Sequence, residues 1–376
     1  MKRALPHILD YIKKADMYLL SLCVISTLIG FVLIWSSTRN SADGTMQMTV
    51  QVASFLLGLF LFVFFSAIDV EILAQRWRLL LAFNILLLIV LFLFGVGDEV
   101  GSRNWLRFFG IGIQPSEIVK ITFVIMMAYH IYYIKEYRNI NSFFSLAVLV
   151  AHFAYLPVLL PDLGNTLIFM FIFLVMLFLA GVHLRWFAFA FALVGVISPV
   201  LWRAFGEYQQ MRILAPFDPT IDPLNLNWNF QAHRSRIAIA SGQVTGQGLG
   251  QGIQTQAGSV PEQHTDFIFS VVGEEFGIIG AILVIVLLTL IILRCFQVAA
   301  RSRNTLQGLV CAGVGAFILF QSLINIGMNL NLAPVIGIAL PFFGYGGSSL
   351  VSTFAAMGIV CGVKMRTVSP WKRQLH

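Results

Sequence analysis

Charged residues are scarce in this chain. Only 11% of its 376 residues are Asp, Glu, Lys or Arg, whereas 58% are hydrophobic. The mean hydropathy is +0.86. Soluble globular domains carry about 25% charged residues. The composition therefore excludes an ordinary water-soluble domain and predicts a polytopic membrane protein.

The patterns that mark several common classes of site are also missing. None of the four cysteines lies in a C-x-x-C pair, so neither a disulfide framework nor a zinc site is indicated. The glycine-rich run 246–252 has no following Lys-Ser/Thr, which excludes a phosphate-binding loop of the Walker type. The net charge of +7 is spread over many short loops and predicts no nucleic-acid partner.

Long apolar runs fill nearly the whole sequence. A helix needs about 20 apolar residues to cross ~30 Å of hydrocarbon. We predict an all-α protein with about ten transmembrane helices. The first run is too long for the apolar core of a signal peptide, so we expect it to be retained. The expected spans are 17–35, 50–68, 79–95, 115–134, 143–160, 163–181, 184–203, 267–293, 307–330 and 346–363.

The distribution of basic residues predicts the orientation. With both termini in the cytoplasm, most of the 24 Lys and Arg residues fall in cytoplasmic loops, as the positive-inside rule requires. This orientation places one long loop, residues 204–266, outside the cell between spans seven and eight. The sequence shows no second domain and no repeat, so residues 1–376 are expected to form one integral-membrane domain.

Asp266 is the first candidate for chemistry, because it is the last ionisable residue before the eighth span. A carboxylate at that depth is a functional-site hypothesis by default. Glu262 and His264 precede it and add two titratable groups at the same membrane face. A structural role is the alternative, since Thr265 and Asp266 are suited to cap the start of a helix.

Glu117 and Lys120 form the second candidate. They are three residues apart at the start of the fourth span, so they share a helix face and can pair. Pro115 suits the first turn of that helix. A charge as deep as Lys120 costs about 2.5–3.5 kcal/mol on insertion scales, and such groups usually face a bundle interior or a wet cavity. The pair therefore predicts a polar substrate-binding cavity or, alternatively, an ion pair that only holds helices together.

The remaining candidates are external arginines and acids. Arg103 and Arg212 could bind phosphate, because guanidinium presents paired donors to phosphate oxygens, although a lone external arginine is more often a solvated surface charge. Asp162 lies in a tight external turn and is suited to cap it. Glu274 and Glu275 lie inside the eighth span, and we expect at least one to point into the bundle.

Taken in order, these motifs resemble the SEDS family of bacterial wall polymerases, which includes RodA, FtsW and SpoVE. The likeness covers essentially the whole chain, and the external loop is closer to the RodA branch. It rests on residues 103–106, 114–120, 161–164, 217–219, 222–224, 262–269, 273–277, 325–328 and 340–349.

The resemblance implies a ten-helix peptidoglycan glycosyltransferase in the bacterial cytoplasmic membrane, with an external active site. Such an enzyme polymerises lipid II into glycan strands for elongation or division and releases undecaprenyl pyrophosphate. The family's essential acid corresponds to Asp266, and its functional Glu and Lys correspond to Glu117 and Lys120. Residues 233–238, Gln243 and Gly344 depart from the family's usual pattern, which affects loop details and not the acidic site.

On this reading Asp266 is the catalytic base, and the substrate-binding residues are Glu117, Lys120, Arg103, Arg212, Asp162 and His264. The partners are lipid II, the undecaprenyl-linked strand, membrane lipid and a class B penicillin-binding protein. Mg²⁺ or Mn²⁺ suits a pyrophosphate leaving group, although no spacing indicates its ligands. A lipid II flippase and a non-catalytic scaffold for the transpeptidase are the alternatives, and a general base at Asp266 separates the polymerase from both.

Overall fold

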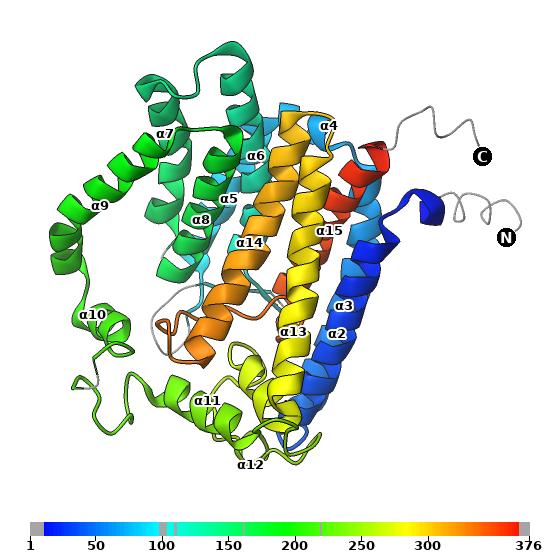
Figure 1. Cartoon of the computed structure of the whole chain (residues 1–376), viewed down its shortest axis with the longest axis vertical. Helices are drawn as coiled ribbons and strands as arrows, with labels where there is room; N and C mark the ends of the chain where they lie inside the picture. The colour runs from blue at the N-terminus through cyan, green and yellow to red at the C-terminus, as the bar shows by residue number, and fades with distance from the viewer. Residues whose placement is uncertain (1–10, 98–103, 109–110, 161, 219, 368–376) are drawn as a thin grey trace, which may run out of the picture.

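The computed structural model describes residues 11–97, 104–108, 111–160, 162–218 and 220–367. Long helices dominate it, and most of them run roughly parallel as a bundle (Figure 1). The helices of the bundle are α2 (Met17–Thr38), α3 (Gly44–Ala67), α4 (Val70–Gln75), α5 (Trp77–Phe94), α6 (Pro115–Tyr137), α7 (Phe143–Leu159), α8 (Leu163–Ala180), α9 (Leu184–Ala204), α13 (Ile268–Ala300), α14 (Thr305–Asn329) and α15 (Gly347–Thr367).

Seven of these helices, α2, α3, α5, α6, α13, α14 and α15, are long and apolar enough to cross a membrane. Three shorter apolar helices, Phe143–Leu159, Gly164–Ala180 and Leu184–Val200, coincide with the other three predicted spans. An integral membrane protein built from helices is therefore confirmed, and the ten-span topology stays a prediction. Helix α9 lies at the edge of the bundle and is tilted away from the other helices (Figure 1).

Two features depart from the expected all-helical chain. Strands β1 (Leu106–Phe108) and β2 (Ile111–Ile113) form a short antiparallel hairpin before α6. Each strand has only 3 residues, which is too short for an alternation of side chains to predict a strand from the sequence. The predicted external loop also contains helices α10 (Glu207–Leu214), α11 (Phe230–Ser241) and α12 (Ile253–Gln256). These short polar helices lie at one end of the bundle (Figure 1).

The two ends of the described chain meet at the opposite end of the bundle. Lys364 Nζ donates hydrogen bonds to the carbonyl oxygens of Lys14 and Ala15, at 3.2 and 3.0 Å. Arg294 Nε donates to Asp16 Oδ2 at 2.8 Å. Both ends of the described chain therefore lie on one side of the bundle, and the basic residues gathered there agree with a cytoplasmic assignment.

Small residues allow α15 to pack closely on α3. A Cβ added to Gly358 would lie 2.4 Å from the carbonyl oxygen of Phe62, and one added to Gly58 would lie 3.1 Å from Cβ of Phe354. Close backbone approach through small residues is how helices associate where lipid offers no hydrophobic driving force. This contact fixes the segment before α15, which borders the candidate site.

Helix α13 is broken one third of the way along its length. Gly277 has φ 65° and ψ −159°, a conformation that only glycine adopts readily. The carbonyl oxygens of Glu274 and Glu275, which a continuous helix would use internally, accept instead from the backbone N–H groups of Gln247 and Gly248. The glycine-rich run 246–252 is thus part of the packed structure.

We expect Gly277→Ala to destabilise the protein by at least about 1–3 kcal/mol, the usual strain of this backbone region. An added Cβ would also lie only 2.5 Å from Gly246 N and Val244 O. The free energy of unfolding of purified protein, measured by SDS titration, checks this. Gly195→Ala is the control, since a Cβ there meets nothing within 4 Å. It should stabilise α9 by about 0.5–1 kcal/mol. Equal stability of Gly277→Ala and wild type would contradict the argument.

Candidate functional site

Asp266 lies where the loop segments 242–265 meet α13. The helix begins after an N-cap at Phe267, and no side chain of that cap residue bonds the first turn. Asp266 therefore precedes the N-cap position. Its side chain is half-buried. This position leaves the carboxylate at the junction of the outer segments and the bundle.

Two asparagines of α14 hold the backbone of Asp266. Asn325 Nδ2 and Asn329 Nδ2 both donate to its carbonyl oxygen, at 2.8 and 3.0 Å. Asn329 Oδ1 in turn accepts from the backbone N–H of Ser270, at 3.1 Å, and so caps the first turn of α13 from a neighbouring helix. Both asparagine side chains are fully buried. The acid is thus fixed by interactions made inside the bundle.

A second segment, residues 335–338, lies against the acid. Asn325 Nδ2 also donates to the carbonyl oxygen of Ile338, at 2.7 Å. A Cβ at Gly337 would lie 3.6 Å from Asp266 Oδ2. Ile336 belongs to the same segment, and a Cβ at Gly164 would lie 2.9 Å from its carbonyl oxygen. The start of α8 and Asp266 therefore contact adjoining residues of one segment.

This contact brings Asp162 to the site. Asp162 is the N-cap of α8, and its Oδ1 accepts from the backbone N–H of Gly164 at 2.9 Å, so the predicted capping role is present. Burial raises the pKa of this carboxyl, while hydrogen bonds from Gly164 and Asn165 and the nearby charge of Arg212 oppose the rise. The charge of Arg212 on α10 is therefore within electrostatic range of Asp162.

His264 connects the acidic strip, residues 262–266 before α13, to α3. Its Nε2 lies 3.3 Å from Gln47 Nε2, and its backbone carbonyl accepts from the N–H of Tyr345 at 2.7 Å. Burial lowers the pKa of His264, and the nearby Glu262 carboxylate opposes that effect. His264 thus ties the residues before Asp266 to two other parts of the bundle.

Glu117 and Lys120 pair inside the bundle. Lys120 Nζ donates to Glu117 Oε1 at 2.7 Å, and the two side chains are only 5% and 1% exposed. Ser352 of α15 donates to the other carboxylate oxygen at 3.0 Å. The ammonium lies 5.7 Å from the ring centre of Phe317, eight residues before Asn325 on α14. Eight residues of helix span about 12 Å. The pair therefore lies about 12 Å below the level of Asp266.

Glu274 and Glu275 also point inward, as expected, and they secure the outer loop. The Glu274 carboxylate accepts from the backbone N–H groups of Gln254 and Thr255 and from the Thr255 hydroxyl, at 2.7, 2.8 and 2.6 Å. Glu275 Oε1 accepts from Ser36 Oγ at 2.6 Å. These acids hold the loop against α2 and α13.

The structure thus gathers Asp266, Asp162, Arg212 and His264 around one end of the bundle, with Glu117 and Lys120 beneath. Arg103 lies outside the described residues. Sequence reasoning did not assign the positioning role of Asn325 and Asn329. Their signal was two amides spaced by four residues, which puts them on one face of an otherwise apolar helix.

The arrangement suits acid–base chemistry at a membrane surface. A half-buried carboxylate with a fixed backbone can accept a proton from a hydroxyl, and a nearby arginine can neutralise an anionic leaving group. Among the residues that the structure describes, no three His, Cys, Asp or Glu side chains group as a metal site.

The chain is similar over almost its whole length to one known family. The model of the FtsW, RodA and SpoVE family, described as cell cycle proteins, matches residues 16–368. A probable peptidoglycan glycosyltransferase FtsW from Wigglesworthia glossinidia brevipalpis is 35% identical over 312 residues, 81% of this chain and 80% of that protein. The peptidoglycan glycosyltransferase MrdB of Escherichia coli K12 is 32% identical over 350 residues, 92% of this chain and 91% of that protein.

A solved structure shares the fold. Its description reads "Structural coordination of polymerization and crosslinking by a peptidoglycan synthase complex". The matching chain superposes with a TM-score of 0.79 at 27% identity, covering 94% of this chain and 99% of that one.

We expect Lys120→Met to cost about 3–5 kcal/mol in the free energy of unfolding, because it leaves the buried Glu117 carboxylate without its cation. SDS titration of the purified variant checks this. The matched variant Glu117→Gln with Lys120→Met should regain at least half of the loss, since no charge is then left unpaired. A single variant as stable as wild type would show that the pair is not buried as described.

Stability should also depend on pH through His264. Because its pKa is lower in the folded protein than the usual value of about 6.5, the unfolded chain binds the proton more readily. The stabilisation is complete above the unfolded pKa of about 6.5, and it is lost as the pH falls from there toward the lower pKa of the folded protein. Thermal unfolding at pH 7.5 and 5.5 should show a larger loss for wild type than for His264→Gln. Identical losses in the two proteins would refute this.

Proposed function

The chain belongs to the FtsW, RodA and SpoVE family of cell cycle proteins, and from this premise we propose that it polymerises lipid II into glycan strands at the outer face of the cytoplasmic membrane. Its curated relatives are named peptidoglycan glycosyltransferases, and this chain is a peptidoglycan glycosyltransferase as well. The product serves cell shape or cell division. The observation that supports the site is the immobilised, half-buried Asp266 where the outer segments enter the bundle.

Asp266 acts as the general base in this mechanism. It takes the proton from the 4-hydroxyl of the GlcNAc in the incoming lipid II. That oxygen forms a bond to C1 of the lipid-linked sugar at the end of the growing strand. The bond from C1 to the pyrophosphate oxygen breaks with its electron pair, so the configuration at C1 inverts and undecaprenyl pyrophosphate leaves.

The cation of Arg212 supports departure of that anion. It lies close enough to Asp162 to influence its pKa, at the start of α8 and next to the segment that contacts Asp266. Preorganised cations are most effective where charge develops in the transition state. Asp162 and His264 are positioning residues. Asp162 caps α8, and His264 joins the acidic strip to α3. A divalent cation remains a proposed requirement, and no step of this mechanism passes through it.

Glu117 and Lys120 support the site from within the bundle. Their mutual bond and the contact with Ser352 join α6 to α15, whose first residues follow the segment bonded to His264. We propose that Glu117 and Lys120 position the residues of the outer segments that contact the substrate. A lipid path through the protein would require this pair to separate, whereas both side chains are sealed in the structure.

A class B penicillin-binding protein is the proposed partner. The structurally similar synthase complex is described as coordinating polymerisation with crosslinking. A transpeptidase needs nascent strands on the outer face, which is where the proposed orientation places Asp266, Arg212 and the helices α10 to α12. The bundle would then be a multi-pass enzyme that releases its product directly beside the crosslinking enzyme.

We expect Asp266→Asn to reduce glycan-strand formation from purified lipid II by at least about a hundredfold, because general-base catalysis contributes 10²–10⁴. The assay contains a class B penicillin-binding protein and is run with Mg²⁺, with Mn²⁺ and with chelator. Asp218→Asn is the matched control, since that exposed carboxylate accepts hydrogen bonds from Thr220 in the same outer segment. It should retain wild-type activity.

Equal product from folded Asp266→Asn and wild type would remove Asp266 from the chemistry. If wild type also made no strands with its partner, a lipid-translocation assay would test the flippase alternative. Normal growth supported by Asp266→Asn in cells would favour the scaffold alternative.

A further inference from the structure

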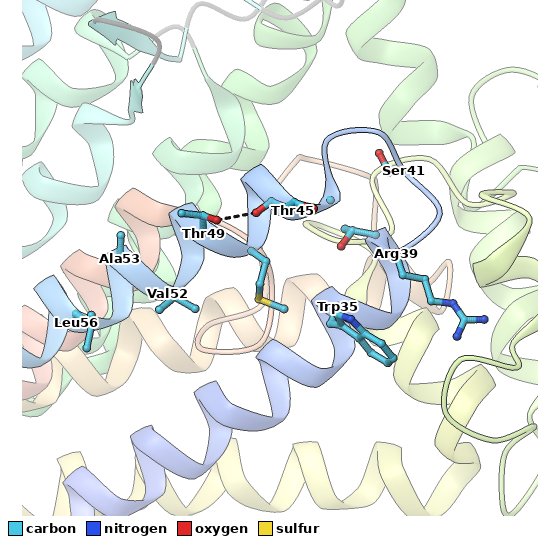
Figure 2. Close-up of a pocket in the computed structure, with 11 residues that line it drawn as sticks. Trp35, Arg39, Ser41, Thr45, Thr49, Val52, Ala53 and Leu56 are labelled. Carbon is cyan, nitrogen blue, oxygen red and sulfur yellow. Dashed lines mark hydrogen bonds between the residues drawn. The ribbon is translucent and has the colours of Figure 1, made fainter.

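A groove of about 630 Å³ lies between α2 and the first half of α3, away from the residues of the proposed reaction (Figure 2). This volume is within the range of small-molecule sites. The groove is lined by Trp35, Thr38, Arg39, Ser41, Gly44, Thr45, Met48, Thr49, Val52, Ala53 and Leu56.

The groove is polar at one end and apolar along the rest of its length. Arg39, Ser41 and Thr45 come from residues at or beside the turn between the helices, with the Arg39 guanidinium pointing toward the outer loop, whereas Val52 and Leu56 continue along α3 (Figure 2). The interval from residue 45 to 56 corresponds to about 16 Å of helix. That is half of the ~30 Å hydrocarbon core, which is the depth of one leaflet.

The polar end carries a cation that faces only neutral acceptors. Arg39 Nε donates to Gln256 Oε1 at 2.7 Å, and its Nη2 donates to the carbonyl oxygen of Gly250 at 2.6 Å. Within the described ranges no ion pair involves Arg39. The amide of Gln256 stands between Arg39 and the buried Glu275. Asp43 lies in the same turn but does not line the groove.

The groove and the reaction site lie on opposite faces of α3. One face carries Gln47, which contacts His264, and Gln51, which contacts Gly344 and Gly346. At 100° per residue the groove residues Thr45, Val52 and Leu56 fall roughly opposite. An occupant of the groove is therefore separated by α3 from Asp266, so the groove does not suit the sugar-bearing end of a reacting substrate.

We propose that this groove binds one anionic glycerophospholipid of the surrounding leaflet. Its phosphate contacts Arg39 and the hydroxyls of Ser41 and Thr45, and one acyl chain lies along Val52 and Leu56. The match of groove length to one leaflet, together with the cation at the polar end, favours this occupant over a protein helix. The assignment goes beyond glycosyl transfer, because the lipid is neither donor nor acceptor.

The site also joins the membrane to the outer loop. Arg39 is the residue that contacts both the groove and the loop residues Gly250 and Gln256. Gln256 extends the connection to Glu275 and to the carbonyl oxygen of Ser36. Bound phosphate would hold the guanidinium in place and so stabilise the loop that leads to Asp266.

Trp35 supplies a direct probe, since it lines the groove and is 47% exposed. Full-length protein is placed in phosphatidylcholine nanodiscs that contain a small fraction of brominated phosphatidylglycerol or brominated phosphatidylcholine. Bromine quenches tryptophan on contact. The signal of Trp35 is the difference between wild type and Trp35→Phe, which removes the background of the other tryptophans.

Brominated phosphatidylglycerol should quench Trp35 at an about fivefold lower mole fraction than brominated phosphatidylcholine, as expected for one basic residue at a membrane surface. Arg39→Gln should abolish this preference. Arg203→Gln, an exposed arginine at the end of α9, should keep it. Asp43→Asn should strengthen it, because a neighbouring negative charge is removed.

Equal quenching by the two lipids in wild type would overturn the proposal, as would a preference that survives Arg39→Gln. Displacement of phosphatidylglycerol by a polyprenyl phosphate at lower mole fraction would assign the groove to an isoprenoid lipid instead and refute the glycerophospholipid. None of these outcomes depends on glycan synthesis, so failure of this inference is distinguishable from failure of the proposed function.

Discussion

The carbonyl oxygen of Asp266 accepts two hydrogen bonds from buried amides of α14, and the arrangement of the site depends on them. Because Asn329 also bonds the backbone N–H of Ser270, the same amides fix the start of α13. Asn325 fixes the neighbouring segment through Ile338. The position of Asp266 is thus held through its backbone carbonyl by two buried amides.

Several other buried charged groups are likewise held by partners from distant segments. A membrane interior supplies no water, so each such group needs a protein partner. The break at Gly277 is possible because the glycine-rich run donates to the carbonyl oxygens of Glu274 and Glu275. The Glu117 and Lys120 charges are tolerated because they neutralise each other. Structure and chemistry are therefore coupled, since the outer loop that bears the acid also completes the helix beneath it.

The arrangement separates two kinds of surface around α3. One face of this helix contacts His264 and the segment before α15, whereas the other opens a groove to lipid. An enzyme that draws a lipid-linked sugar from the bilayer has to keep its reacting end apart from ordinary lipid. A helix with one face toward the chemistry and one toward the membrane provides that separation, and Arg39 connects the two through the loop.

The sequence alone determined the membrane class, the helix positions and the candidates Asp266, Glu117, Lys120 and Asp162, because long apolar runs and stray charges are local signals. Only the tertiary structure decided that Asn325 and Asn329 hold Asp266, that Glu274 secures the loop and that Gly277 interrupts α13. Those facts depend on contacts between residues tens to hundreds of positions apart. Hydropathy and spacing describe one segment at a time, and hydrogen-bond partners from distant segments are set only when the helices pack.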